Sequence, residues 1–190
     1  MKILEQIDNY VLHSAEVKKL ESEVELYKRS EFYASVEGDL SYGNGDYKSE
    51  KQYNESYKFS RQKREEANTK LATEKRLLNA SIEDLSNSMS NISKKDLQVA
   101  KDKTSLKIEQ LSEYVAGLQE KMKIAKEKGD LAFSQGNYRD EKIYNAEYKS
   151  AYEETQKIGP VIGEYKNVLS FLNFREQTIN ESSASEPSFS

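Results

Sequence analysis

GDLSYGNGDYKSEKQYNESYK, residues 38–58, recurs later in the same chain as GDLAFSQGNYRDEKIYNAEYK, residues 129–149. The two stretches align without a gap at an offset of 91 residues, and eleven of the twenty-one positions are identical. The same offset pairs apolar residues outside the stretch, for example Leu20 with Leu111. Self-similarity at a fixed spacing indicates a repeated structural unit, so the chain of 190 residues is predicted to contain two copies of one unit.

Each unit is predicted to consist of two long helices joined by a tight turn. Apolar residues flank the repeated stretch at alternating spacings of three and four, which is the heptad pattern of packed helices. In the first unit this stripe comprises Val17, Leu20, Val24, Tyr27 and Ala34, then Tyr53, Tyr57, Ala67, Leu71, Leu78, Ile82, Leu85, Met89 and Ile92, with polar residues at Ser60, Arg64 and Glu74. In the second unit it comprises Ile108, Leu111, Val115, Leu118, Met122 and Ala125, then Tyr144, Tyr148, Ala151, Thr155, Ile158, Ile162, Tyr165, Leu169 and Leu172.

The residues at the centre of the repeated stretch are those of a turn. Gly43, Gly45 and Gly136 can adopt positive φ angles, and Asp46 and Asn137 can cap the helix that follows. The stretch therefore predicts that each unit reverses its direction here.

Three further signals set the limits of the helices. Ser93, followed by Asp96 three residues later, predicts a capping box at the start of the third helix. Pro160 is expected to kink or break the fourth helix, since it has no backbone N–H to donate. Residues 181–190, ESSASEPSFS, are expected to form a disordered tail.

The expected fold is all-α, with two tandem-duplicated long antiparallel helical hairpins. Helices of about 35–42 residues would each be about 50–60 Å long, and short turns make neighbouring helices antiparallel. The hairpins are expected over residues 1–90 and 91–180. They would form either one elongated four-helix bundle or two coiled-coil hairpins packed together.

Composition disfavours several classes of function. Charged residues make up 33% and hydrophobic residues 36% of the chain, as expected for solvated helices that bury a narrow stripe. The net charge is −4 with both signs interspersed, so nucleic-acid binding is disfavoured. No segment has the ~20 apolar residues of a membrane span, so we expect a cytoplasmic protein without membrane association.

Motifs of catalysis and cofactor binding are not found in the sequence. The chain has no cysteine and one histidine, His13, which excludes the usual zinc ligand sets. It contains neither a phosphate-binding P-loop nor a nucleophile elbow. With 33 acidic residues on solvated helices, no pair of carboxylates stands out. We therefore expect no enzyme activity, no metal and no cofactor.

The repeated stretch predicts a close approach of the two helices next to each turn. On the incoming helix the stripe continues with small residues, Gly38 in the first unit and Gly129 in the second, and on the outgoing helix with Tyr53 and Tyr144. Small residues that receive large rings allow close packing of helices without leaving a void. This device closes the end of each hairpin.

Packing alone does not require the polar residues of the repeated stretch. Together with the neighbouring tyrosines they are candidates for binding a ligand or a partner, because tyrosine combines an apolar ring with a hydrogen-bonding group. The candidates are Asp39, Glu50, Lys51, Tyr53, Asn54 and Tyr57 in the first unit, and Asp130, Glu141, Lys142, Tyr144, Asn145 and Tyr148 in the second.

The turn resembles a tetratricopeptide hairpin. Gly129, Gly136 and Tyr138 fall where that family has its first-helix glycine, its turn glycine and the tyrosine that follows, and Gly38, Gly45 and Tyr47 do the same. The resemblance covers about twenty residues per unit and implies similar packing at the turn. The period of 91 residues differs from the roughly 34 of that family.

Two hypotheses of function follow. The first is a non-enzymatic interaction or scaffold protein that binds or occludes a partner protein, or a second copy of itself, through helical faces and a tyrosine-rich end. A phage-encoded inhibitor of a bacterial protein is one form of it, because a composition rich in lysine, asparagine and tyrosine is common in AT-rich genomes. The second is a small-ligand or nucleotide-binding protein with its site at the Tyr/Glu/Lys/Asn cluster. A membrane-curving bundle is disfavoured, since it requires a basic face.

Overall fold

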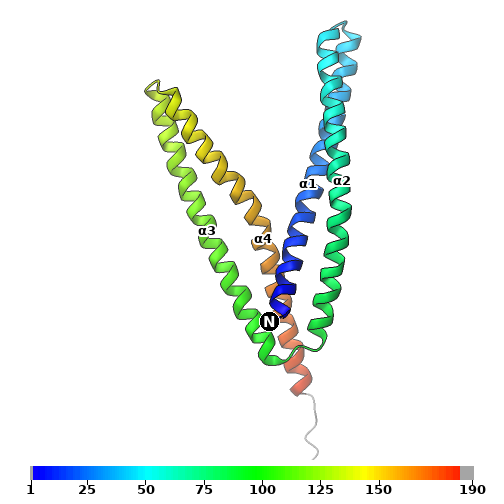
Figure 1. Ribbon diagram of the computed structural model, residues 1–190, viewed down its shortest axis with the longest axis vertical. Helices are drawn as coiled ribbons and strands as arrows, with labels where there is room; N and C mark the ends of the chain where they lie inside the picture. The colour runs from blue at the N-terminus through cyan, green and yellow to red at the C-terminus, as the bar shows by residue number, and fades with distance from the viewer. Residues whose placement is uncertain (1, 185–190) are drawn as a thin grey trace, which may run out of the picture. The chain divides into compact units, whose positions relative to one another are not determined.

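The computed structural model describes residues 2–184, which fold into four long helices without a strand (Figure 1). These are α1 (Lys2–Gly43), α2 (Tyr47–Ser90), α3 (Lys94–Ser134) and α4 (Tyr138–Ala184). Helices α1 and α2 form one antiparallel hairpin, and α3 and α4 form the other. The predicted all-α class and the two hairpins are confirmed. Helices α1 and α3 have 42 and 41 residues, within the predicted range, whereas α2 and α4 are longer, with 44 and 47 residues.

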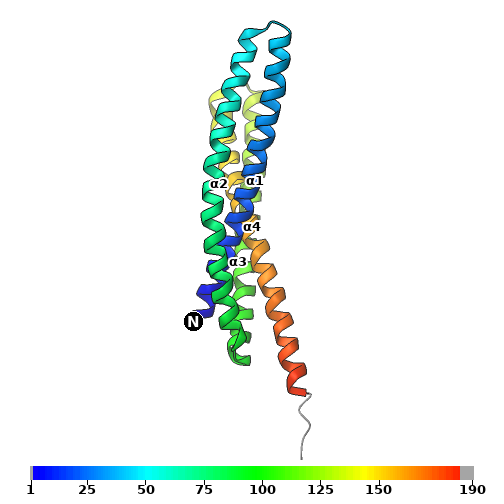
Figure 2. The ribbon, with the colours of Figure 1, turned by 90° about the vertical axis from the view of Figure 1, so that its right-hand side faces the viewer.

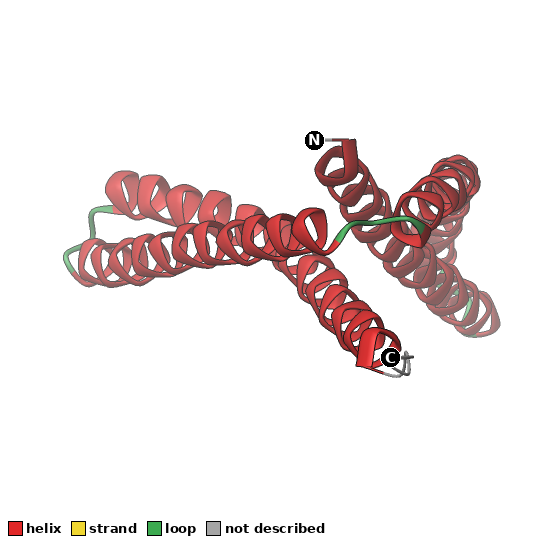
Figure 3. Cartoon of the chain, turned by 90° about the horizontal axis from the view of Figure 1, so that it is seen from below, coloured by secondary structure: helices red, strands yellow, loops and turns green. Residues whose placement is uncertain are grey.

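The described chain is helical except at three short connections (Figure 3). The contacts divide it into two compact units. One is Leu12–Ser86, and the other combines the described parts of Met1–Val11 and Asn87–Ser190. The compact unit that holds the α3–α4 hairpin therefore also contains the first residues of α1 and the last residues of α2. Whether each predicted repeat is a domain in its own right stays a prediction.

The unit Leu12–Ser86 is held together by the predicted stripe. Figure 2 shows α1 and α2 side by side up to their turn. Val17, Leu20, Ala34 and Ala67 are buried, as the spacing predicts. Ile82 is an exception, because it is 45% exposed and Ser81 is buried instead. Ala67 before it and Leu85 and Met89 after it are buried as predicted, so the departure is confined to this turn of α2.

The other unit contains the largest fully buried side chains. They are Ile7 and Val11 from α1, Leu97 from α3 and Leu172 from α4. The first turns of α1 therefore contribute core residues to the unit of α3 and α4. Hydrophobic residues at Ile3, Ile7 and Val11 follow the helical spacing of a buried face.

A long-range hydrogen bond joins α4 to α1 within this unit. The hydroxyl of Tyr165, whose ring is 3% exposed, donates to Asp8 Oδ1 over 2.6 Å. Burial raises the pKa of Tyr165 above its usual value, and the hydrogen bond to the Asp8 carboxylate and its negative charge add to this effect. The neutral phenol is therefore the form that the fold stabilises.

This environment predicts a loss of stability at high pH. A raised folded pKa means that the contribution of Tyr165 is complete below the unfolded pKa of about 10 and is lost as the pH rises through the folded value. In an ultraviolet titration of the folded protein, we expect Tyr165 to ionise after the exposed tyrosines. The variant Tyr165→Phe should lack this late step. A late step of unchanged amplitude in the variant would assign it to another tyrosine.

The helix caps agree with the sequence. Asp46 Oδ1 accepts from Ser49 N over 3.1 Å, and Asn137 Oδ1 accepts from Asp140 N over 3.3 Å. These are N-caps of α2 and α4, and the hydrogen bonds from Ser49 lower the pKa of Asp46.

The cap of α3 differs in one detail from the predicted capping box. The Ser93 hydroxyl oxygen accepts from Asp96 N over 3.1 Å, so Ser93 is the N-cap. Its hydroxyl also donates to Asp96 Oδ2 over 2.7 Å. In a capping box that carboxylate would accept from the backbone N–H of the cap residue. Aspartate is one methylene shorter than the glutamate of the usual box.

Helix α4 runs through Pro160 without a break. Of the two outcomes predicted at Pro160, the break is therefore wrong, and the kink stays a prediction. Because Pro160 has no N–H, the carbonyl of Gln156 loses its helical hydrogen-bond donor. Both residues are exposed, so water can donate to that carbonyl instead. The helix also continues to Ala184, so residues 181–184 of the predicted tail are helical. Residues 185–190 of that tail lie outside the described residues.

Candidate protein-binding surfaces of the hairpins

The repeated stretch forms the same turn in both hairpins. In the first turn Gly45 N donates to Tyr42 O and Asp46 N donates to Ser41 O, over 3.0 and 2.9 Å. In the second turn the equivalent bonds, from Gly136 and Asn137, have the same lengths. Gly45 and Gly136 have φ angles of 75° and 71°, the left-handed conformation that glycine adopts without strain. The two predicted turns are confirmed, but the expectation for Gly43 is wrong, because Gly43 is the last residue of α1 and its φ angle is not positive.

The close approach beside each turn is also confirmed. Gly38 is buried, and a Cβ atom placed on it would lie 3.6 Å from Tyr53 Cβ. At Gly129 the corresponding distance, to Tyr144 Cβ, is also 3.6 Å. Both tyrosines are half-buried. Each glycine thus lies opposite a tyrosine stem, at a distance that would bring an added Cβ into ordinary van der Waals contact.

The polar candidates divide into two kinds. The glutamates make short-range bonds along their own helix: Asn54 Nδ2 donates to Glu50 and Asn145 Nδ2 to Glu141, each over 3.4 Å. The charged candidates that remain are exposed and make no hydrogen bond or ion pair with another described residue. They are Asp39, Lys51, Asp130 and Lys142. The structure therefore brings together only part of the predicted cluster, and its role in binding stays a prediction.

The tyrosines of the candidate set lie in different surroundings. Tyr57 is half-buried, whereas its counterpart Tyr148 is 36% exposed and stacks on Tyr152 with ring centroids 6.4 Å apart. The Tyr144 ring has Lys128 Nζ above it, 5.7 Å from the centroid. Tyr53 meets the Tyr33 ring edge-on at 6.5 Å.

An exposed aromatic pair at each turn was not among the sequence candidates. Tyr42 and Tyr47 pack edge to face with centroids 6.1 Å apart and an interplanar angle of 73°. Phe133 and Tyr138 form the same pair at 6.2 Å and 73°. All four rings are more than 60% exposed. We call these the aromatic tips. Their identical offset in the repeat was the signal that could have identified them.

The first hairpin also carries a groove that the sequence analysis missed. It has a volume of about 850 Å³ and runs between α1 and α2 below the turn. Leu26, Tyr33, Tyr53 and Phe59 contribute its apolar surface. Leu26 and Tyr33 belong to a second, exposed stripe on α1 that continues to Leu40 at spacings of seven residues. That spacing was the available signal, but the more regular buried stripe obscured it.

Arg64 and Glu74, the charged residues that interrupt the apolar stripe of α2, have partners within the chain. Arg64 Nε lies 2.9 Å from Glu31 Oε1 of α1, where Glu31 is 7% exposed. The two atoms are misaligned for a hydrogen bond, so the attraction is that of an ion pair. The polar residue at position 64 of the stripe therefore has an opposite charge within the same hairpin.

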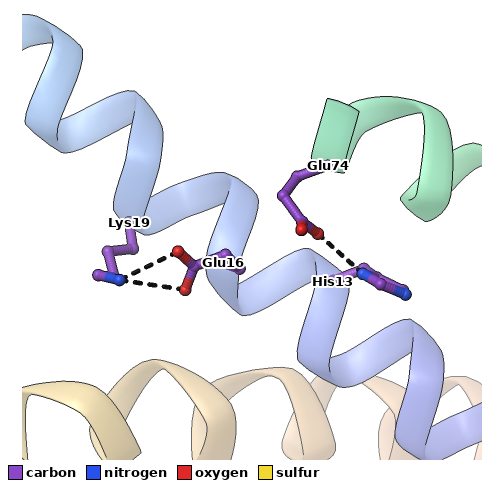
Figure 4. A network of polar contacts seen from close by, with 4 residues as sticks. All are labelled: His13, Glu16, Lys19 and Glu74. Atoms are coloured by element: carbon purple, nitrogen blue, oxygen red, sulfur yellow. Dashed lines mark hydrogen bonds and ion pairs between the residues drawn. The ribbon is translucent and has the colours of Figure 1, made fainter. Parts of the chain in front are cut away.

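Glu74, the second charged residue in the α2 part of the stripe, pairs with His13, the only histidine of the sequence. His13 Nδ1 lies 2.8 Å from Glu74 Oε2, and both side chains are about a quarter exposed. Figure 4 shows this contact between α1 and α2, and a separate pair of Glu16 and Lys19 within α1. His13 therefore links α1 to α2 in this hairpin.

The described residues contain no group of three or more His, Cys, Asp or Glu side chains placed to hold a metal ion. Among the same residues, no helix is apolar over enough of its length to cross a membrane. No family model, curated protein or solved structure matches this chain.

Proposed function

We propose that this chain is a non-enzymatic interaction protein that binds a partner protein with its aromatic tips. The observation that carries the proposal is the pair of edge-to-face ring contacts, one at each turn, with matching geometry and high exposure. An exposed ring that is already fixed by a neighbour loses little conformational entropy when it is buried in a complex. Aromatic side chains are also the residues that most often carry binding energy at protein interfaces.

The local structure supports this role. Each tip lies on a turn whose backbone is held by several hydrogen bonds and a capped helix, so the rings are presented on a rigid base. The ligand-binding hypothesis stays a prediction. It has less support, because Asp39, Lys51, Asp130 and Lys142 are exposed and make no hydrogen bond or ion pair with another described residue.

The proposal is tested by capture from the cells of origin with three immobilised proteins. These are the wild-type chain, a tip variant and a control. The tip variant carries Tyr42→Ser, Tyr47→Ser, Phe133→Ser and Tyr138→Ser. The control carries serine at Lys58, Lys70, Lys107 and Lys149, which are exposed positions outside the turns.

We expect the wild-type chain and the control to retain the same protein, and the tip variant to lose it by tenfold or more. Such a loss is about 1.4 kcal/mol of binding free energy, less than the usual value of a central aromatic contact. Circular dichroism of the three proteins checks that the tip variant remains helical. Equal recovery of the protein by the tip variant would refute the proposal.

A further inference from the structure

One side of the first hairpin carries large apolar side chains that are more than half exposed. Leu26, Tyr33 and Leu40 lie at seven-residue intervals on α1 and are 60%, 61% and 55% exposed. Phe59 of α2 lines the same groove and is 58% exposed. A stripe at seven-residue spacing fits another helix, because each side chain can enter a hole between residues of the facing helix.

We infer that a second copy of this chain covers this face. The two α1–α2 hairpins pack face to face about a two-fold axis that is perpendicular to the helices. Each α1 then lies antiparallel to α1 of the other copy, and Tyr33 and Phe59 lie nearest the axis. Leu26 of one copy faces Leu40 of the other. A two-fold interface requires such self-complementarity, since every contact occurs twice.

The charges beside the stripe match this arrangement. Arg29 and Glu37 flank Tyr33, each four residues away, so antiparallel packing places Arg29 of one copy beside Glu37 of the other. On α2, Glu55 and Lys63 flank Phe59 in the same way. Lys63 lies on the groove side of its helix, with its Nζ atom 5.9 Å from the Phe59 ring centroid. Four pairs of opposite charge then surround the apolar centre of the interface, and they add to the pairs that Arg29 makes with Glu25 and Lys63 with Glu66 within one chain.

The same charges disfavour the other two-fold arrangement. If the axis ran along the helices, α1 of one copy would face α2 of the other at the same level. The contacts of Gly38 with Tyr53 and of Glu31 with Arg64 set these levels, and they place Arg29 level with Lys63 and Glu37 level with Glu55. Like charges would then meet at every pair, which opposes association.

The second hairpin provides an internal control. At the offset of 91 residues, Leu26 is replaced by Gly117, Tyr33 by Ile124 and Phe59 by Ser150. The apolar stripe is thus reduced in the repeat, although the turn and the aromatic tip are retained. The aromatic tips are separate from this face, so the inference does not rest on the proposed function.

The first test uses the absence of cysteine from the chain. Tyr33→Cys and, as a control, Ile124→Cys give proteins with one thiol each, and a short bifunctional maleimide joins thiols that lie close together. We expect a solution mass of two chains for the wild type and efficient cross-linking of Tyr33→Cys alone. A strictly monomeric mass, or cross-linking of the Ile124→Cys variant instead, would overturn the inference.

The second test reverses the charges. Arg29→Glu should weaken the dimer about tenfold or more, because it creates two like-charge pairs across the axis. The double variant Arg29→Glu with Glu37→Arg should restore it. A dimer that is indifferent to Arg29→Glu, or a double variant as weak as the single one, would count against this interface. Capture by the aromatic tips is measured on the same variants, so a failure of self-association stays distinguishable from a failure of the proposed function.

Discussion

Replacing Arg64 by methionine should lower the free energy of unfolding by about 2–3 kcal/mol. The variant leaves the carboxylate of Glu31, which is 7% exposed, without its opposite charge. Removing one partner of a buried pair costs about 3–5 kcal/mol. We expect the lower figure because the Arg64 side chain is 31% exposed, so water already screens the pair in part. Urea unfolding followed by circular dichroism measures the change.

The opposite replacement should be milder. In Glu31→Met the guanidinium of Arg64 remains about a third exposed and can turn further toward water, so we expect a loss of about 1 kcal/mol. The double variant should recover most or all of the wild-type stability, because a buried ion pair can be replaced by apolar residues of similar volume. If the two single losses simply add in the double variant, then Arg64 and Glu31 do not interact in solution.

The turn and its neighbours could be predicted from sequence because short-range geometry determines them. Gly45 and Gly136 adopt the positive φ that their positions suggested, and Asp46 and Asn137 cap the helices that follow. Gly38 and Gly129 lie on the buried stripe, so their place opposite a tyrosine follows from helical spacing alone.

Features that depend on a partner helix could not be predicted in the same way. Arg64 was recognised as a polar gap in the stripe, but its partner Glu31 lies 33 positions earlier, and many other acidic residues were equally available. Asp39 and Lys51 were candidates for a polar cluster beside the turn, but their side chains are exposed and make no hydrogen bond or ion pair with another described residue. Spacing along one helix says which face a residue is on and leaves open which side chains of the other helix it meets.

Replacing Gly38 by alanine should raise the free energy of unfolding by about 0.5–1 kcal/mol. A glycine inside a helix costs up to about 1 kcal/mol relative to alanine. The added Cβ would be in ordinary van der Waals contact with its neighbours, at 3.6 Å from Tyr53 Cβ and 3.7 Å from Asn54 Oδ1. Gly129→Ala should behave in the same way, since its distances are both 3.6 Å. Urea unfolding of the two variants gives the comparison.

Two matched variants separate close packing from backbone freedom. Gly38→Leu should destabilise by about 1–3 kcal/mol, because the larger side chain has no space against the Tyr53 stem. Gly45→Ala should destabilise by about 1–2 kcal/mol for a different reason, since its φ angle of 75° is strained for alanine although nothing lies near its Cβ position. Destabilisation by Gly38→Ala itself would mean that α1 and α2 approach more closely in solution. The glycine would then be required by the packing of the hairpin end, rather than merely accommodated there.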